Sequence, residues 1–435
     1  MLYQNYIQNA ELGWDFYGPV LAMAALMLIG VPVWVALGLG AVLMLSVSGA
    51  LPLSIMGDTL FSGIDSFALI ALPLFILTGD VIVTSRLSDK LLDLAEAAFG
   101  WVRSGLGTST IVGCGFFGAI SGSNSADCAA IGRITIPRLV ERGYPVSYAA
   151  AIVASGACTA ILIPPSISYI IIGITLGISA AQLFAAAVIP GVVFLAWIII
   201  TNVVVNRIRG YEQARGRFEF GRLARATWEA KFALMVPVII LGGIYSGVFT
   251  PTEAASVAVL TGIAIGFATR RLKLADFPSM LERSAEVNGI IGPIIAVALV
   301  LAQVLSILHV PTAAVTAITD LTSNPQLIIL FMFALFIVAG CVMETTPCIL
   351  LLAPILLPVA DNIGMDRIHF CVFMITSLAI GFITPPVGLN LFVVSGLTGE
   401  PITRIARQAL PFVLGMTIPT LLIAYFPKLT LGLFR

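Results

Sequence analysis

The sequence of 435 residues predicts an all-α polytopic membrane protein built from two inverted-topology repeats, each with a re-entrant helical hairpin and a broken transmembrane helix. Three observations predict this fold. Hydrophobic residues form 59% of the chain and charged residues 10%, and the mean hydropathy is +1.07, outside the range of soluble domains. Basic residues cluster in alternate connections. Proline-interrupted segments recur at one constant spacing along the chain.

The charge distribution predicts the topology. Basic residues cluster around residues 86–103, 133–142, 207–231, 270–283 and 404–407. Lys and Arg are absent from the connections at 49–65, 177–183, 248–252 and 309–326. Basic loops face the cytoplasm in most membrane proteins, so both termini are predicted to be periplasmic.

Ten apolar segments are long enough to cross a bilayer as helices. They are residues 14–31, 32–48, 66–85, 146–177, 183–207, 231–248, 252–270, 287–308, 369–398 and 408–428. The first two are predicted as a short pair hinged at Gly30 and Pro32, with one long tilted helix as the alternative. Segments 50–63 and 87–100 are amphipathic, and we expect them to lie along the membrane interfaces.

Two further apolar segments, 105–140 and 327–362, start and finish on the same side of the membrane in this topology. Each is too long for one crossing and has a polar turn near its middle. We therefore predict two re-entrant helical hairpins, the first entering from the cytoplasm and the second from outside.

The prolines indicate an internal repeat. Pro164 and Pro165 in the first half of the chain match Pro385 and Pro386 in the second. We call the spacing from Pro164 to Pro385 the repeat spacing. Five crossings in each half would insert the second half upside down, a pattern typical of secondary transporters. The predicted domains are a first repeat at 1–210, a basic cytoplasmic linker at 211–230 and a second repeat at 231–435.

Four polar features are predicted to meet near the middle of the membrane. They are the hairpin turns "SGSNSAD" (121–127) and "METTP" (343–347), and the helix breaks "ILIPPSIS" (161–168) and "TPPVGLN" (384–390). A broken helix exposes carbonyl groups at one cut end and N–H groups at the other, and lipid cannot satisfy either. Carbonyl and hydroxyl oxygens suit a small hard cation, whereas helix N-termini suit an anion. The pattern favours a combined site for sodium and a carboxylate.

Several polar residues also have structural explanations. Asn124 followed by Asp127 resembles a helix cap, and we expect capping together with ligand contact. Thr384 can bond a carbonyl of its own kink, although the repeat favours an ion-site role. Glu344 fits a cap of the second hairpin and a site role equally well.

The remaining candidates favour structural roles. An ion pair of Asp80, near Arg86, is expected, and Glu253 is expected at a helix N-terminus. His309 and His369 lie at predicted external helix ends. Six single cysteines are expected to be buried apolar residues, namely Cys114, Cys128, Cys158, Cys341, Cys348 and Cys371.

Several function classes are disfavoured. A net charge of zero argues against nucleic acid as a partner. No lysine follows a glycine, so the chain has no Walker A loop for ATP. A membrane-embedded enzyme would need a nucleophile, base or metal set, and a passive channel would show no saturable counterflow. We predict that the chain is not an enzyme and has no cofactor other than a coupling ion.

At these motifs the chain resembles the large membrane subunit (DctM-like) of the tripartite ATP-independent periplasmic, or TRAP, transporters. The resemblance covers essentially the whole chain. It is carried by "GAISGSNSADCAAIG" (118–132), "ILIPPSISYIIIG" (161–173), "FITPPVGLNLFVVSGL" (382–397) and "PVWVALGLGAVLML" near the start.

The resemblance implies a sodium-coupled importer of an organic acid in the bacterial inner membrane. It implies a scaffold and an elevator-type transport domain, a small four-helix membrane subunit (DctQ-like) and a periplasmic binding protein (DctP-like). Because the chain starts at the large subunit's first helix, we expect the small subunit to be a separate polypeptide. Sialic acid, C4-dicarboxylates and other organic acids remain open as substrates. The alternative is a stand-alone divalent-anion:sodium symporter.

The resemblance also implies site residues. The first sodium site is expected to use Ser121, Ser123, Asn124, Ala160, Ile163 and Pro164. The second is expected to use Thr345, Thr384, Pro385, Gly388 and Asn390. Candidate substrate ligands are Asn124, Ser125, Ser166, Thr345, Thr346 and Asn390. Ala160 departs from a glycine common in the family, which puts the backbone geometry of that carbonyl ligand in question.

Overall fold

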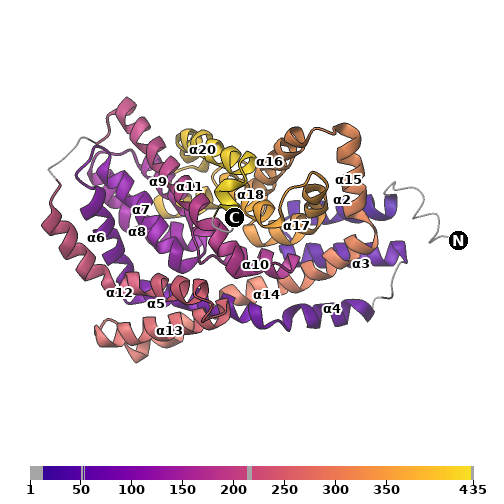
Figure 1. The fold of residues 1–435 in the computed structure, drawn as a ribbon, viewed down its shortest axis with the longest axis horizontal. Coiled ribbons are helices and arrows are strands. Elements are labelled where there is room, and N and C mark those ends of the chain that lie inside the picture. The colour runs from indigo at the N-terminus through magenta and orange to yellow at the C-terminus, as the bar shows by residue number, and fades with distance from the viewer. Residues whose placement is uncertain (1–12, 50–51, 53, 213–217, 433–435) are drawn as a thin grey trace.

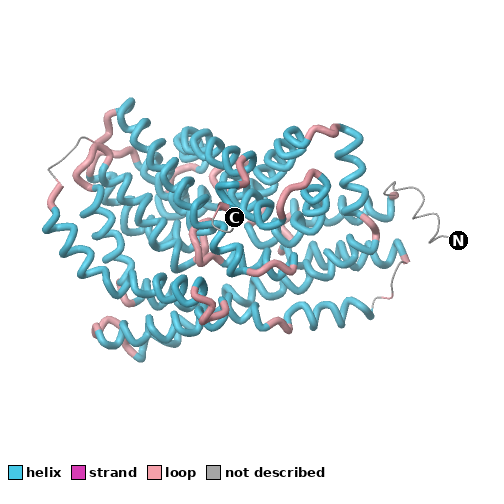
Figure 2. Tube along the Cα trace, viewed as in Figure 1, coloured by secondary structure: helices cyan, strands magenta, loops and turns pink. Residues whose placement is uncertain are grey.

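The computed structural model describes residues 13–49, 52, 54–212 and 218–432. This part of the chain is helical and has no β-strand (Figure 2). Eight of its helical segments have the length and hydropathy needed to cross a membrane, and several shorter apolar helices accompany them. The predicted class of an all-α membrane protein is therefore confirmed.

The first repeat begins with two separate helices, α2 (Trp14–Leu28) and α3 (Val33–Ser48), which pack against each other. Gly30 has a positive φ of 87° between them, so the alternative of one long helix was wrong. The helices that follow are α4 (Ser54–Ile64), α5 (Ala71–Thr84), α6 (Leu87–Phe99), α7 (Gly105–Ser121), α8 (Asn124–Glu141), α9 (Val146–Ala157), α10 (Ile167–Leu176) and α11 (Ala180–Arg209).

The second repeat has a matching order of helices. It contains α12 (Phe220–Tyr245), α13 (Pro251–Ala268), α14 (Phe277–Ile307), α15 (Val310–Leu321), α16 (Pro325–Val342), α17 (Thr345–Asn362), α18 (Arg367–Gly381), α19 (Leu389–Thr398) and α20 (Ile402–Tyr425), and the short α21 (Lys428–Leu431) follows. The hairpins α7–α8 and α16–α17, and the broken helices α9–α10 and α18–α19, lie where the sequence predicted them.

Three predicted boundaries need correction. The crossing predicted at 231–248 begins earlier, at Phe220, as α12, so this helix includes part of the predicted linker 211–230; residues 213–217 lie outside the described residues. The crossing predicted at 287–308 begins earlier, at Phe277, as α14, because α4 packs along it. The connection 309–326 contains the helix α15, which packs against α14 and α17.

Elements of the first repeat can be matched to elements of the second by shifting them along the sequence. A shift by the repeat spacing places α6 on α15, and it places α4 and α5 together on the single helix α14. The part of the amphipathic segment 50–63 that α4 covers therefore corresponds to the first half of α14, so this helix is broken in one repeat and continuous in the other; residues 50, 51 and 53 lie outside the described residues. Cys158 donates a hydrogen bond from its thiol to the carbonyl of Ala379, at 3.1 Å. These two residues are themselves separated by the repeat spacing, so the axis relating the repeats passes close to them.

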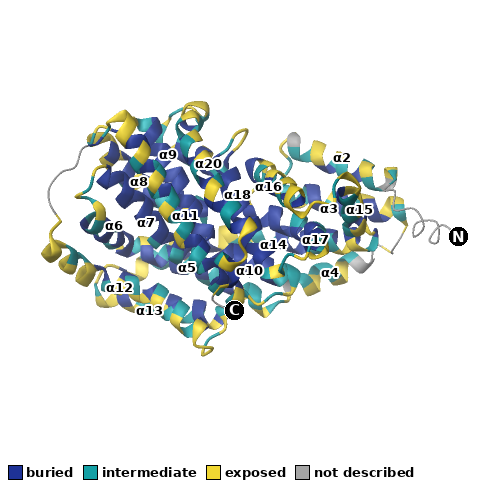
Figure 3. Cartoon of the chain, turned by 45° about the horizontal axis from the view of Figure 1, so that its top comes forward, coloured by how far each residue is buried: buried dark blue, intermediate teal, exposed yellow. Residues whose placement is uncertain are grey.

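The core lies at the hairpins and broken helices. Every residue of α9 from Ser147 to Ala157, and of α18 from His369 to Gly381, is buried. The helices α12 and α13 keep exposed apolar faces at the edge of the molecule (Figures 1 and 3), and α14 also exposes apolar residues such as Leu281 and Ile290. This distribution suits a lipid-facing outer layer around a packed centre.

Candidate functional site

The first hairpin turns directly against the first broken helix. Gly122, with φ of 60°, joins α7 to α8. A Cβ at this position would lie 2.9 Å from the backbone nitrogen of Ile167 and 3.2 Å from Cα of Ser166. Only glycine fits this combination of left-handed backbone and close approach. The N-terminus of α8 therefore faces the N-terminus of α10.

The break between α9 and α10 is short and buried. A 3-10 turn (Cys158–Ile161) follows α9, and a loop through a cis Pro164–Pro165 peptide leads to Ser166. Ser166 caps α10, because its hydroxyl accepts a hydrogen bond from the amide of Ser168 and donates one to the carbonyl of Ile161. This candidate substrate ligand thus has a complete local role.

The break between α18 and α19 is more open. It also contains a cis prolyl peptide, Pro385–Pro386, and both prolines are exposed. The hydroxyl of Thr384 donates to the carbonyl of Ile380 at 2.8 Å, so the local kink contact is present. The amide of Gly388 donates to the carbonyl of Cys341 at 3.1 Å, which ties this loop to the end of α16.

The second hairpin turn is exposed on one side. Glu344 precedes α17 with an exposed side chain and makes no capping hydrogen bond, so the capping interpretation was wrong. Thr345 and Thr346 are buried. The hydroxyl oxygen of Thr345 has no hydrogen-bond partner within the described residues.

Asn390 connects the two repeats. Its side-chain amide donates to the carbonyl of Ala154 at 2.9 Å, and its amide oxygen accepts a bond from Asn124 at 3.2 Å. Asn390 is fully buried, and Asn124 is 2% exposed. The side chain assigned to the second sodium site therefore contacts the first hairpin and α9. This pair brings the predicted residues of both sites together.

Asp127 lies one turn into α8, and its side chain is not a helix cap. Its backbone amide bonds the carbonyl of Ser123, but both carboxylate oxygens are fully buried without a hydrogen-bond partner in the described structure. Asn124 also makes no capping bond. The capping interpretation of both residues was wrong. An acidic residue inside a membrane helix is a functional candidate by default, which is the sequence signal that could have identified Asp127.

The other predicted ligands of the first site lie around the same turn. The hydroxyl of Ser121 lies 3.4 Å from the amide of Ser123, and the hydroxyls of Ser123 and Ser125 are 3.3 Å apart. A Cβ at Gly118 would approach Cα of Ala160 to 2.6 Å. Because Ala160 lies in the 3-10 turn and has no positive φ, alanine fits there. Ile163 and the buried Pro164 follow in the next loop.

Four helix N-termini converge here. Those of α8 and α10 meet at Gly122, and those of α8 and α19 meet at the Asn124–Asn390 pair. The N-terminus of α17 follows the end of α16, where the carbonyl of Cys341 accepts a hydrogen bond from the amide of Gly388 before α19. The N-cap side chains of α8 and α17 accept no capping hydrogen bond, and the N-cap of α19 is a glycine, Gly388. Helix dipoles and first-turn N–H groups at this point favour a bound anion.

Residues outside this centre have structural roles. Asp80 does form an ion pair, with Arg283 at 3.4 Å rather than with Arg86. Glu253 completes a capping box with Thr250.

His369 is buried and hydrogen-bonded to Thr430 at 2.7 Å. His309 precedes α15, and the six cysteines are free and buried.

The fold and this centre define a polytopic membrane transport subunit with paired hairpins and broken helices. The family model "Tripartite ATP-independent periplasmic transporter, DctM component" matches residues 20–429, and the chain belongs to this family. Its relatives are transporter permease subunits rather than enzymes.

Two curated relatives and one solved structure illustrate the match. The isethionate TRAP transporter permease DctMQ of Oleidesulfovibrio alaskensis is 38% identical over 93% of this chain, which spans 64% of that protein's length. The C4-dicarboxylate TRAP transporter large permease DctM of Pseudomonas aeruginosa is 36% identical over 86% of this chain and 88% of its own. The YdaH transporter of Alcanivorax borkumensis has a similar fold, with a TM-score of 0.63 at 12% identity over 86% of this chain and 89% of its own.

Proposed function

We propose that the chain is the large subunit of a sodium-coupled importer of an organic acid anion in the bacterial inner membrane. The observation that carries the proposal is the buried centre, where uncapped helix N-termini from both repeats meet around Asn124 and Asn390. The positive ends of these helices favour the anion. The hydroxyl and carbonyl oxygens of the hairpin turns and helix breaks favour a small cation beside it. Isethionate and C4-dicarboxylates, named for two relatives, belong to this anion class.

The proposed transporter has two partners, a small membrane subunit and a periplasmic binding protein that delivers the anion. The test is uptake into proteoliposomes that hold the large and small subunits, with loaded binding protein outside. We expect uptake only with an inward sodium gradient. Uptake that proceeds equally well without the binding protein would favour the stand-alone symporter, and uptake without sodium would contradict coupling.

We propose that the hairpins and broken helices move as one body against α2–α5 and α12–α14 in an elevator mechanism. A Cβ at Gly79 on α5 would lie 3.7 Å from Cβ of Ser121, within the range for a disulfide. Oxidation of a Gly79→Cys/Ser121→Cys variant should therefore stop transport, and reduction should restore the rate seen before oxidation. The two single variants serve as controls. Full transport by the completely cross-linked protein would contradict the movement.

A further inference from the structure

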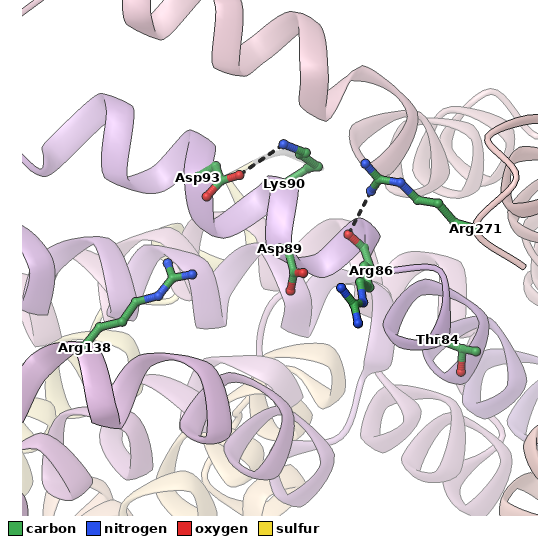
Figure 4. A pocket seen from close by; sticks show the side chains of 7 residues that line it. All are labelled: Thr84, Arg86, Asp89, Lys90, Asp93, Arg138 and Arg271. Carbon is green, nitrogen blue, oxygen red and sulfur yellow. Dashed lines mark hydrogen bonds and ion pairs between the residues drawn. The ribbon is translucent and has the colours of Figure 1, made fainter.

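A concave site lies away from the centre. A pocket of about 510 Å³ is lined mainly by Arg86, Asp89, Lys90, Asp93, Arg138 and Arg271 (Figure 4). We call it the arginine pocket. Its walls come from the start of α6, the last part of α8 and the segment after α13, which are far apart in sequence. Its volume is in the range of ligand sites.

The charges in the arginine pocket are not balanced internally. Lys90 is paired with Asp93 at 3.3 Å and with Glu229 at 2.7 Å, and the bond to Glu229 holds the pKa of Lys90 above its ordinary value. In contrast, Arg86, Arg138 and Arg271 form no ion pair with a carboxylate in the described part of the chain. Among the described residues, three arginines without an ion pair therefore line the pocket, against one such carboxylate, Asp89.

The start of α6 adds further anion-binding groups. Arg86 precedes the helix with φ of 53° and provides no side-chain cap, so the first-turn N–H groups of α6 have no capping acceptor. Arg86, Asp89 and Lys90 at this end of α6 line the pocket, and the positive end of the helix dipole lies there. Arg271 donates from Nη1 to the carbonyl of Arg86 at 3.3 Å, which holds its guanidinium at the pocket's edge (Figure 4). Planar guanidinium groups with helix N–H groups form the chemistry that binds phosphate.

We propose that the arginine pocket binds a phosphate group, carried by an anionic phospholipid or by a soluble phosphate monoester. Arg138 is on the first hairpin, whereas Arg86 and Arg271 follow the outer helices α5 and α13. A phosphate held by all three therefore joins the hairpin to the outer layer. Basic clusters at a membrane surface attract anionic headgroups, which makes a lipid source compatible with this position.

The test measures binding to the purified, delipidated full chain. Native mass spectrometry counts bound phosphatidylglycerol or zwitterionic phosphatidylcholine, and thermal unfolding with a thiol-reactive dye reports stability, since all six cysteines are buried. We expect saturable binding of phosphatidylglycerol. The triple change Arg86→Gln, Arg138→Gln and Arg271→Gln should weaken it by roughly tenfold or more, because bidentate phosphate bonds are lost. Arg407→Gln is the matched control, since Arg407 is exposed and lies outside the pocket.

A second variant keeps the charge that guides membrane insertion. Replacing the same three arginines with lysine should still weaken binding several-fold, because lysine cannot make the bidentate contact. Protection by millimolar glycerol 3-phosphate would identify phosphate alone as sufficient, whereas protection by phosphatidylglycerol only would identify a lipid headgroup. Equal binding of phosphatidylcholine, or unchanged binding of phosphatidylglycerol by both triple variants, would overturn the proposal.

Discussion

The two junctions where a hairpin meets the broken helix of the other repeat share a backbone plan but differ in side chains. In one, α8 packs against α19; in the other, α17 packs against α10. At the first, Asn124 and Asn390 form a buried hydrogen bond. Their counterparts at the repeat spacing are Thr345 and Tyr169, and the hydroxyls of both are buried without a partner in the described structure.

The loops differ in the opposite direction, because the exposed helix break belongs to the first junction and the buried one to the second. Residues 164–166 of the first helix break are buried, whereas residues 385–387 of the second are exposed. Both breaks contain a cis prolyl peptide. Both repeats thus keep the interruption of the helix. The side chains next to the interruption determine whether the buried polar groups of a junction are hydrogen-bonded within the protein. The buried, unpartnered hydroxyls of Thr345 and Tyr169 at the second junction are where a ligand would add the most hydrogen bonds.

The largest expected effect tests the closed junction. Asn390→Ala leaves the carbonyl of Ala154 and the amide of Asn124 without a partner, so we expect a loss of about 3 kcal/mol in the free energy of unfolding. Tyr169→Phe, at the repeat-related position, should cost less than about 1 kcal/mol, because its hydroxyl has no bond to lose. Thermal unfolding in detergent compares them. Equal losses would show that the two junctions are not different.

A second prediction tests the close approach of the α16 and α18 backbones at Gly340 and Gly381. A Cβ at Gly381 would lie 2.5 Å from the backbone carbon of Gly340. Since backbone atoms cannot move aside easily, Gly381→Ala should lower the free energy of unfolding by about 2 kcal/mol. The control is Gly396→Ala in α19, where a Cβ meets nothing within 4 Å. A loss no larger than that of the control would mean that α16 and α18 are not this close.

The sequence predicted most of the order of hairpins and broken helices, but not the side-chain contacts between them. The prolines and the charge pattern predicted both hairpins and both breaks, because lipid tolerates such interruptions only inside protein. The absence of basic residues made 309–326 resemble a loop, although shifting α6 by the repeat spacing would have predicted α15. At the start of α14 the cause was the opposite, because the basic cluster 270–283 made that segment resemble a cytoplasmic loop. The Asn124–Asn390 bond depends on how helices cross, which neither spacing nor hydropathy specifies.

A third prediction exchanges residues between the repeats. Asp127 corresponds to Cys348, and the two side chains have similar volumes. In sodium-free buffer, Asp127→Cys should raise the free energy of unfolding by about 1–2 kcal/mol, because it removes a buried carboxylate that has no hydrogen bond. The reciprocal Cys348→Asp should be destabilising. A loss of stability in Asp127→Cys would show that the carboxylate is satisfied in the protein, for example by a retained cation.

The smallest expected effect concerns Ala160, the repeat counterpart of Gly381. Because Ala160 lies in a 3-10 turn with no positive φ, its backbone does not need glycine. Ala160→Gly should therefore lower the free energy of unfolding by no more than about 1 kcal/mol, from lost packing against Gly118 and greater freedom of the unfolded chain. If the carbonyl of Ala160 binds sodium, the sodium concentration for half-maximal uptake should stay within about threefold of the parent value, because the carbonyl position is unchanged. A much larger shift in the sodium requirement would mean that the alanine side chain, and not the carbonyl alone, shapes the first cation site.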